Sequence, residues 1–119
     1  MQNRAPRAAS LRTIKPVDFG LYHAIFDALS EPMRLQMLRM IASTSELPCT
    51  ALEHSLPVTK STISYHVKIL YRAQLIQVRK EGRYFFYKVR RDVFSRFLPG
   101  FLRRLVVEGV GLAMTQDHA

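Results

Sequence analysis

The chain has 119 residues, with 18 lysine and arginine residues against 9 aspartate and glutamate residues, a formal net charge of +9 and a pI of about 10.3. This length suits one domain with a modest core, and so large a cationic surplus favours a polyanionic partner: DNA, RNA or an anionic membrane. No apolar run reaches the roughly 18 residues that span a bilayer, no apolar signal core stands at the N-terminus, and the single cysteine, Cys49, excludes an internal disulfide. We therefore expect a cytoplasmic protein.

The first 16 residues differ in composition from the rest of the chain. They hold four cations and two prolines, with no acidic residue and little periodicity. This composition is typical of a segment without a packed structure. We interpret residues 1–16 as a flexible basic arm. It either touches the minor groove or phosphates of a nucleic acid or is a solvated tail, and the tail is the plainer interpretation.

Proline marks the starts of two short helices. Pro32 fits the first position of a helix that runs to about Ala42, because its missing N–H and fixed φ cost nothing there. The helical period then places Arg34 and Arg39 outward. Pro48 opens a third helix, which the next proline stops. The predicted inward positions around these two helices are Leu35, Leu38, Ile41, Ala42, Leu47, Leu52 and Leu56.

The fourth predicted helix is the one around which the chain is organised. Thr59 supplies the oxygen that a helix N-cap prefers, and no glycine or proline interrupts the residues that follow. Ile63, Val67 and Leu70 share a narrow inward stripe. The opposite arc carries cations, hydroxyls and a phenol but no carboxylate: Lys60, Ser61, Ser64, Tyr65, Lys68 and Arg72. With the third helix it has the spacing of a helix-turn-helix, whose second helix reads the major groove; alone, it could equally be an amphipathic helix with a solvated basic face.

Two stretches after this helix predict a β-hairpin. Residues 75–80 and 84–89 are rich in β-branched and aromatic side chains, and Glu81 and Gly82 form the turn between them. An exposed turn can be basic for no functional reason, but a cationic hairpin after a reading helix is the layout of a wing that lies along DNA. The predicted DNA contacts are Lys60, Ser61, Thr62, Ser64, Tyr65, Lys68, Arg72, Arg79, Lys80 and Arg83.

Apolar patterns at both ends of this region are unusually aromatic. Residues 17–29 repeat apolar side chains at spacings of three and four, which predicts a first helix. A fifth helix begins near Asp92, although Pro99 and Gly100 must kink or split it. One small domain cannot easily hide so much aromatic surface. We therefore predict a homodimer, with an interface that contains Phe19, Tyr22, Phe26, Phe94, Phe97 and Phe101.

Three motifs in order resemble the ArsR/SmtB family of winged-helix transcriptional repressors. They are LSEPMRLQMLRMI at 29–41, similar to the family's second helix, TKSTISYHVKIL at 59–70, similar to its reading helix, and RKEGRYFFYKV at 79–89, similar to its wing. The resemblance implies a mainly α winged helix-turn-helix with a small β-hairpin wing. It also implies a homodimeric repressor that leaves a palindromic operator when an effector binds. By the motif match, Ser61, Ser64 and Tyr65 face bases, and Lys60, Lys68 and Arg83 lie near phosphates.

The sequence departs from this family where its members bind metal. Family sensors often carry two cysteines in a Glu-Leu-Cys-x-Cys stretch, whereas residues 46–50 here read Glu-Leu-Pro-Cys-Thr. Another group carries histidines on the fifth helix, but none occurs here between His66 and His118. We predict no metal and no cofactor. The remaining alternative is a site across a dimer, built from Asp117 and His118 with a residue such as His23.

Three single residues allow more than one interpretation. Gln74 stands where the family usually has glycine at the end of the reading helix, and glutamine in a left-handed cap costs some stability, so a different turn is an alternative there. His66 lies at the border of the core stripe, and a backbone partner is a plainer role for it than that of a ligand or base reader. Cys49 is more simply a small hydrophobe than a redox centre.

These patterns predict a basic arm at 1–16, a winged helix-turn-helix domain at 17–106 and a tail at 107–119. No acid/base pair, phosphate-binding glycine loop or nucleophile constellation is visible, so nothing predicts an enzyme. The favoured function is a sequence-specific regulator that binds double-stranded DNA. The alternatives are a winged-helix module whose partner is a protein, and an RNA-binding module, which lacks the expected exposed aromatic platform.

Overall fold

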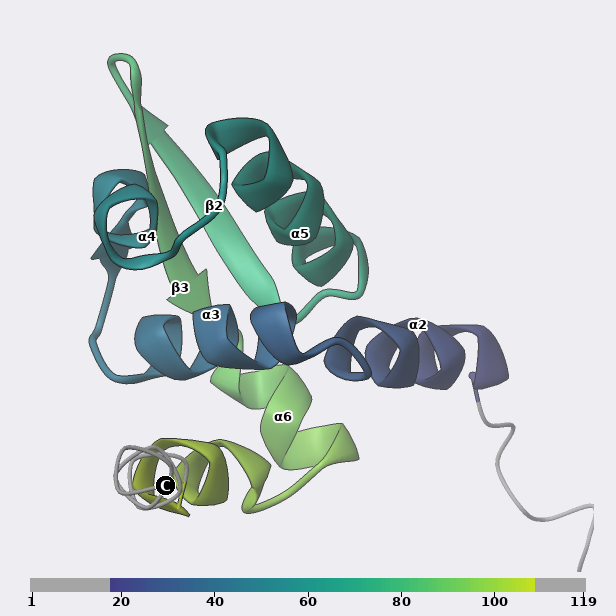
Figure 1. Cartoon of the computed structure of the whole chain (residues 1–119). Coiled ribbons are helices and arrows are strands. Elements are labelled where there is room, and N and C mark those ends of the chain that lie inside the picture. The colour runs from purple at the N-terminus through teal and green to yellow at the C-terminus, as the bar shows by residue number, and fades with distance from the viewer. Residues whose placement is uncertain (1–17, 109–119) are drawn as a thin grey trace, which may run out of the picture.

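The computed structural model describes residues 18–108, so the predicted arm and nearly all of the predicted tail lie outside the described residues. Helices surround a small antiparallel sheet (Figure 1). In chain order the elements are α2 (Phe19–Leu29), α3 (Pro32–Ala42), β1 (Leu47–Pro48), α4 (Cys49–Ser55), α5 (Lys60–Arg72), β2 (Ile76–Glu81), β3 (Tyr84–Val89) and α6 (Arg91–Phe97), followed by a helical segment at 101–108. The fold is a winged helix-turn-helix, with α4 and α5 as the helix pair and β2–β3 as the hairpin.

Side-chain caps define where the helices start. Pro32 occupies the first turn of α3, and the carboxylate of Glu31 before it accepts from the N–H groups of Met33 and Arg34. Thr59 caps α5, because its hydroxyl oxygen accepts from the N–H of Thr62 at 3.2 Å. Both predicted helix starts are confirmed.

The sheet has three strands in the order β1–β3–β2, one more than the sequence predicted. Leu47 pairs with Tyr87 and Pro48 with Phe86, so Leu47 belongs to an edge strand rather than to the third helix. Its predicted inward position is confirmed, because Leu47 is buried in the core. Pro48 is extended, with φ −71° and ψ 147°. Proline has no N–H to donate, and an edge strand tolerates it because one side of that strand forms no hydrogen bonds with another strand. The helix after it begins at Cys49.

The hairpin turn is one residue later than predicted. Glu81 pairs with Tyr84, which leaves Gly82 and Arg83 as a two-residue turn. Gly82 has φ +63°, a conformation that glycine adopts without steric cost. Gln74 also has a positive φ, of +65°, between α5 and β2. A left-handed residue after α5 is therefore kept despite the missing glycine.

The inward face of α3 is rotated from the predicted one. Met37, Leu38 and Ile41 are fully buried, whereas Leu35 is only half-buried. Arg34, predicted to point outward, is 6% exposed, and that prediction is wrong. The reason is that its guanidinium finds acceptors inside the molecule, which a helical wheel cannot show.

The last helix is split where the sequence predicted. α6 ends at Phe97, Gly100 takes φ +84°, and the chain is helical again from residue 101. Phe94 is 3% exposed and stacks on Phe101, with ring centroids 5.9 Å apart. Phe94 is thus a core residue of the single chain, which corrects its predicted place in a dimer interface.

The molecule has two distinct ends (Figure 1). The hairpin turn and the start of α5 lie at one end. The helices α2 and α6 and the segment 101–108 lie away from that end, with α2 beside α3 and the other two beyond it. Within residues 18–108, every helix is too short or too polar to cross a membrane.

Candidate nucleic-acid interface

The outer arc of α5 is exposed as predicted. Its buried side chains are Ile63, Val67 and Leu70, together with His66. The exposed ones are Lys60, Ser61, Ser64, Tyr65, Lys68 and Arg72, while Thr62 is half-buried. Tyr65 is 60% exposed in the middle of this arc. The arc therefore presents hydroxyls and a phenol between cations, on a helix that has no acidic residue.

The cations of this arc are largely available to an anionic partner. Lys60 lies 3.8 Å from the carboxylate of Glu53, a long contact for an exposed pair. Within residues 18–108, neither Lys68 nor Arg72 forms a salt bridge. Phosphate oxygens could replace water around these side chains without breaking a strong contact inside the protein.

The hairpin carries its cations above aromatic rings. The ammonium of Lys80 lies 5.7 Å from the ring centroid of Phe85, and the guanidinium of Arg83 lies 5.5 Å from that of Tyr84. Such cation–π contacts restrain long side chains that would otherwise be free. Lys80 and Arg83 are exposed, and neither is among the salt bridges of the described part of the chain.

A groove of about 410 Å³ joins the helix to the hairpin. Its apolar lining includes Phe85 and Tyr87 of the hairpin, and burial raises the pKa of Tyr87 to about 12. Ser64, Lys68 and Lys80 line the same groove, so the structure brings these three predicted contacts together. One strand of a nucleic acid could contact both α5 and the hairpin at this groove.

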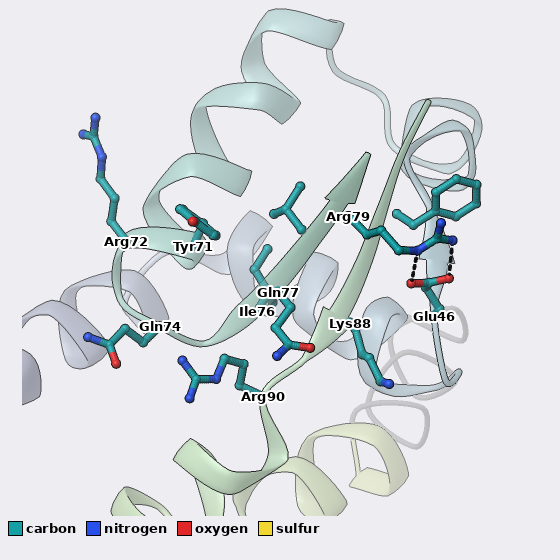
Figure 2. A pocket seen from close by; sticks show the side chains of 11 residues that line it. Glu46, Tyr71, Arg72, Gln74, Ile76, Gln77, Arg79, Lys88 and Arg90 are labelled. Atoms are coloured by element: carbon teal, nitrogen blue, oxygen red, sulfur yellow. Dashed lines mark hydrogen bonds and ion pairs between the residues drawn. The ribbon is translucent and has the colours of Figure 1, made fainter. Parts of the chain in front are cut away.

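Arg79 lies apart from the other predicted contacts. Side chains alternate along a strand, so it projects from the face opposite Lys80. It lines a shallow cavity of about 690 Å³ on that face, with Gln77, Lys88 and Arg90 (Figure 2). Both carboxylate oxygens of Glu46 accept from its guanidinium, and a carboxylate oxygen of Glu81 accepts at 2.6 Å. Arg79 is therefore already paired within the chain.

A buried contact behind α5 was missed by the sequence analysis. The Nη1 of Arg34 lies 3.1 Å from the Nδ1 of His66. The same guanidinium donates to the carbonyl oxygens of Ala28, at 2.8 Å, and Asp27, at 3.1 Å. The partner of His66 is thus a side chain, and the prediction of a backbone partner is wrong. The position of His66 at the border of the core stripe was the only signal in the sequence, since the helical period placed Arg34 outward.

The opposite end of the molecule is aromatic rather than basic. Phe19 is 76% exposed and Phe26 54% exposed on α2. Tyr22 stacks on Phe26, with centroids 6.1 Å apart, and meets Phe97 of α6 edge to face at 4.9 Å. With Phe101 half-buried, five of the six aromatic residues predicted for a dimer interface remain accessible in the single chain.

The described residues offer little to a metal ion. No group of three or more His, Cys, Asp or Glu side chains within residues 18–108 could hold one. Cys49 is 8% exposed and packs in the core. The alternative site that includes Asp117 and His118 lies outside the described residues.

Comparison with known proteins gives the family. A helix-turn-helix domain family matches residues 29–79, which include α3, α4 and α5. The chain is 38% identical over 97 residues to the uncharacterized HTH-type transcriptional regulator YceK of Bacillus subtilis, covering 81% of this chain and 97% of that one. It is 31% identical over 68 residues to the arsenical resistance operon repressor of Staphylococcus xylosus, covering 57% and 64%.

Solved structures agree in fold. The homodimeric winged helix-turn-helix DNA-binding domain of Mb0332 from Mycobacterium bovis, described as a possible ArsR-family transcriptional regulator, superposes with a TM-score of 0.60 and 22% identity, covering 100% of this chain and 96% of that one. The chain belongs to the HTH-type transcriptional regulators, and its winged helix-turn-helix fold is of the ArsR type. In this fold α4 and α5 are the two helices of the helix-turn-helix and the β2–β3 hairpin is the wing, and the protein is a DNA-binding regulator.

Proposed function

We propose that this ArsR-type regulator is a homodimeric repressor that binds a palindromic operator through α5 and the wing. One observation carries the proposal: the acid-free outer arc of α5 and the wing share one groove, which Ser64 and Lys68 of the helix and Lys80 of the wing line together. A major groove admits a helix of this size, and a wing beside it reaches the phosphate backbone.

The exposed polar side chains divide by chemistry. Ser61, Ser64 and Tyr65 offer hydroxyls, which can both donate to and accept from base edges. The long cations Lys60, Lys68, Arg72, Lys80 and Arg83 suit phosphates, which fix the position of the protein without reading the sequence. Thr62 sits beside Thr59 at the start of α5, with hydroxyl oxygens 3.0 Å apart, where its exposed part would face the backbone. We leave Arg79 out of the contact set because Glu46 and Glu81 hold it.

The exposed aromatic surface of α2 and α6 forms the dimer interface. Phe19 and Phe26 leave large apolar area in water on α2, and the Tyr22–Phe97 contact makes α2 and α6 one continuous apolar surface. The Mb0332 domain is described as homodimeric, which supports the same assembly here. A two-fold axis at this end would turn two reading helices toward half-sites one helical turn apart. A repressor of this kind works in the cytoplasm and needs no catalytic chemistry.

The promoter upstream of the chain's own gene gives the first test. The protein should retard a labelled fragment of that promoter in the presence of an excess of unlabelled random duplex, and unlabelled promoter should compete. If unlabelled promoter and unlabelled random duplex competed equally for the protein, binding would be nonspecific and the proposal would be contradicted.

A further inference from the structure

Two cavities adjoin on the outer face of the hairpin, the face that carries Arg79. One has a volume of about 690 Å³ and the other of about 560 Å³, and Gln77, Lys88 and Arg90 line both. Figure 2 shows these three side chains at the base of the hairpin, just before α6. The two cavities together form the outer trough, and each is in the size range of small-molecule sites.

Strand pairing sets the positions of the side chains in the outer trough. Gln77 of β2 lies opposite Lys88 of β3. The N–H of Arg90 donates to the carbonyl oxygen of Leu75 at 2.9 Å, so the pairing continues past the end of β3. Residues two apart on a strand share a face, which puts Lys88 and Arg90 next to each other on the outer side. The backbone of the sheet therefore holds both cations in place.

The side chain of Arg90 has more donors than the chain uses. A guanidinium carries five N–H groups, and within residues 18–108 the acceptor for Arg90 is a carboxylate oxygen of Asp92, 2.9 Å from Nη2. The Nε of Arg90 and the Oγ1 of Thr44 are the two buried side-chain N or O atoms in the described part of the chain that have no hydrogen-bond partner. Both residues line the outer trough. Unpaired buried polar atoms are costly, so a ligand with acceptor oxygens would be stabilised here.

The charge of the outer trough also favours an anion. Its carboxylates are already paired, because Arg79 holds Glu46 and Arg90 holds Asp92. Lys88 is exposed and forms no salt bridge with any residue from 18 to 108. An ammonium, a guanidinium, the amide of Gln77 and a hydroxyl can donate from several directions, which suits the oxygen atoms of a phosphate.

We propose that the outer trough binds the phosphate group of a small molecule, with Lys88, Arg90 and Gln77 as its donors. The groove beside α5 lies on the other face of the hairpin, because Lys80, which lines that groove, projects opposite to Arg79. Arg72 lines the trough from the end of α5, but Figure 2 shows its side chain pointing away from the three donors. The ligand is therefore a free phosphorylated molecule rather than the DNA that α5 and the wing hold. This site goes beyond the proposed function and needs neither DNA nor the dimer.

A titration of the full chain with inorganic phosphate, followed by nuclear magnetic resonance, tests the site. Backbone and side-chain signals are recorded while phosphate replaces chloride at constant pH and ionic strength. Lys88→Gln removes the ammonium, and Gln77→Glu places a carboxylate opposite Lys88 that neutralises it and repels an anion. Lys80→Gln, which removes an exposed ammonium from the opposite face, is the matched control.

We expect saturable shifts centred on Gln77, Lys88 and Arg90 in the parent and in Lys80→Gln. Lys88→Gln should weaken phosphate binding by at least about tenfold, as the loss of a charge-assisted hydrogen bond does, and Gln77→Glu should weaken it at least as much. Both replaced side chains are exposed, so circular dichroism should show the helix content of the parent. An added duplex from the promoter of the chain's own gene should leave the phosphate shifts in place.

Two results would overturn this inference. Shifts that grow linearly with phosphate, or that Lys80→Gln reduces as much as Lys88→Gln, would mean diffuse attraction of ions to a basic protein. Displacement of phosphate by the promoter duplex would assign Lys88 and Arg90 to the DNA backbone. Neither result affects the proposed function, which depends on preference for the promoter over random duplex, and loss of that preference would leave the phosphate titration unchanged.

Discussion

The guanidinium of Arg79 holds both carboxylate oxygens of Glu46, at 3.0 Å from Nε and 2.8 Å from Nη2. Glu46 stands directly before β1 and Arg79 lies in β2, so the pair spans the central strand β3. The guanidinium also stacks on Phe86 of β3, 4.4 Å from the ring centroid. This contact fastens the two-residue edge strand to the wing and fixes the position of the wing's base.

Replacing Glu46 by glutamine should destabilise the chain in a pH-dependent way. The hydrogen bond from Arg79 lowers the pKa of Glu46 below its ordinary value of 4.5, so the pair stabilises the folded state above that pH and the contribution is lost as the pH falls through the lowered pKa. The midpoints of thermal unfolding of the parent and of Glu46→Gln should therefore differ at pH 7, and the difference should be smaller at an acidic pH below 4.5. If the two proteins differed equally in thermal stability at both pH values, the charge of the Glu46 carboxylate would not contribute to stability.

The reading helix should lose specificity when its central hydroxyls are removed. Ser64→Ala combined with Tyr65→Ala should lower operator affinity by about 1–3 kcal/mol for each good base contact that these side chains make, with far less change on random duplex. Fluorescence anisotropy with both duplexes measures this. If affinity fell equally on both, the two side chains would be backbone contacts rather than readers.

The wing should contribute to the salt dependence of binding. Arg83→Ala should weaken operator and random duplex alike and reduce the slope of log affinity against log salt by about one unit per phosphate contact, or about two per dimer. Arg79→Ala is the matched control, since that guanidinium is paired with Glu46 and Glu81 and should leave the slope nearly unchanged. Equal slope changes in both variants would mean that the pairs of Arg79 open on DNA.

The aromatic end should control assembly. Phe26→Glu places a charge in the proposed interface, where it would have no partner, so we expect a monomer and loss of operator binding although no DNA-facing residue has changed. Sedimentation at micromolar concentration, where the parent should be a dimer, measures this. Gln77→Glu adds the same charge on the exposed outer face of the sheet and should remain dimeric. A monomeric parent would remove the two-half-site arrangement and favour an interaction module.

Metals should not switch this protein. A transition-metal site needs three or four ligands converging at about 2.0–2.3 Å, and residues 18–108 provide no such group. Operator affinity should therefore change less than about threefold when zinc, nickel or arsenite is titrated into the complex or a chelator is added. One ion bound per subunit, with release of DNA, would instead support a site that includes residues such as Asp117 and His118.

Local signals in the sequence predicted most of this fold. Pro32 and Thr59 mark helix starts because their chemistry suits those positions alone, and the apolar stripe of α5 predicted its buried face. The strand Leu47–Pro48 could not be predicted, because two residues carry no periodicity and the strand exists only through its pairing with β3. Its proline did predict the helix that follows, which begins at Cys49 as expected.

In the candidate site, too, local features could be predicted from the sequence and long-range contacts could not. The exposure of Ser64, Tyr65 and Lys68 follows from helical periodicity, which is a local property. The burial of Arg34 depends on acceptors from two other helices, so its own helix predicted the wrong face. The pairing of Arg79 with Glu46 links residues 33 positions apart, and only the folded sheet brings them together.

Selection of bound sites from a random duplex library shows whether a dimer reads a two-fold symmetric sequence with α5. The parent should enrich a palindrome whose half-sites lie about one helical turn apart, roughly 10 base pairs from centre to centre. Ser64→Ala with Tyr65→Ala should degrade the enrichment at defined positions in each half-site. Recovery of unrelated sequences, or of single half-sites without symmetry, would contradict the reading of a palindrome by a dimer.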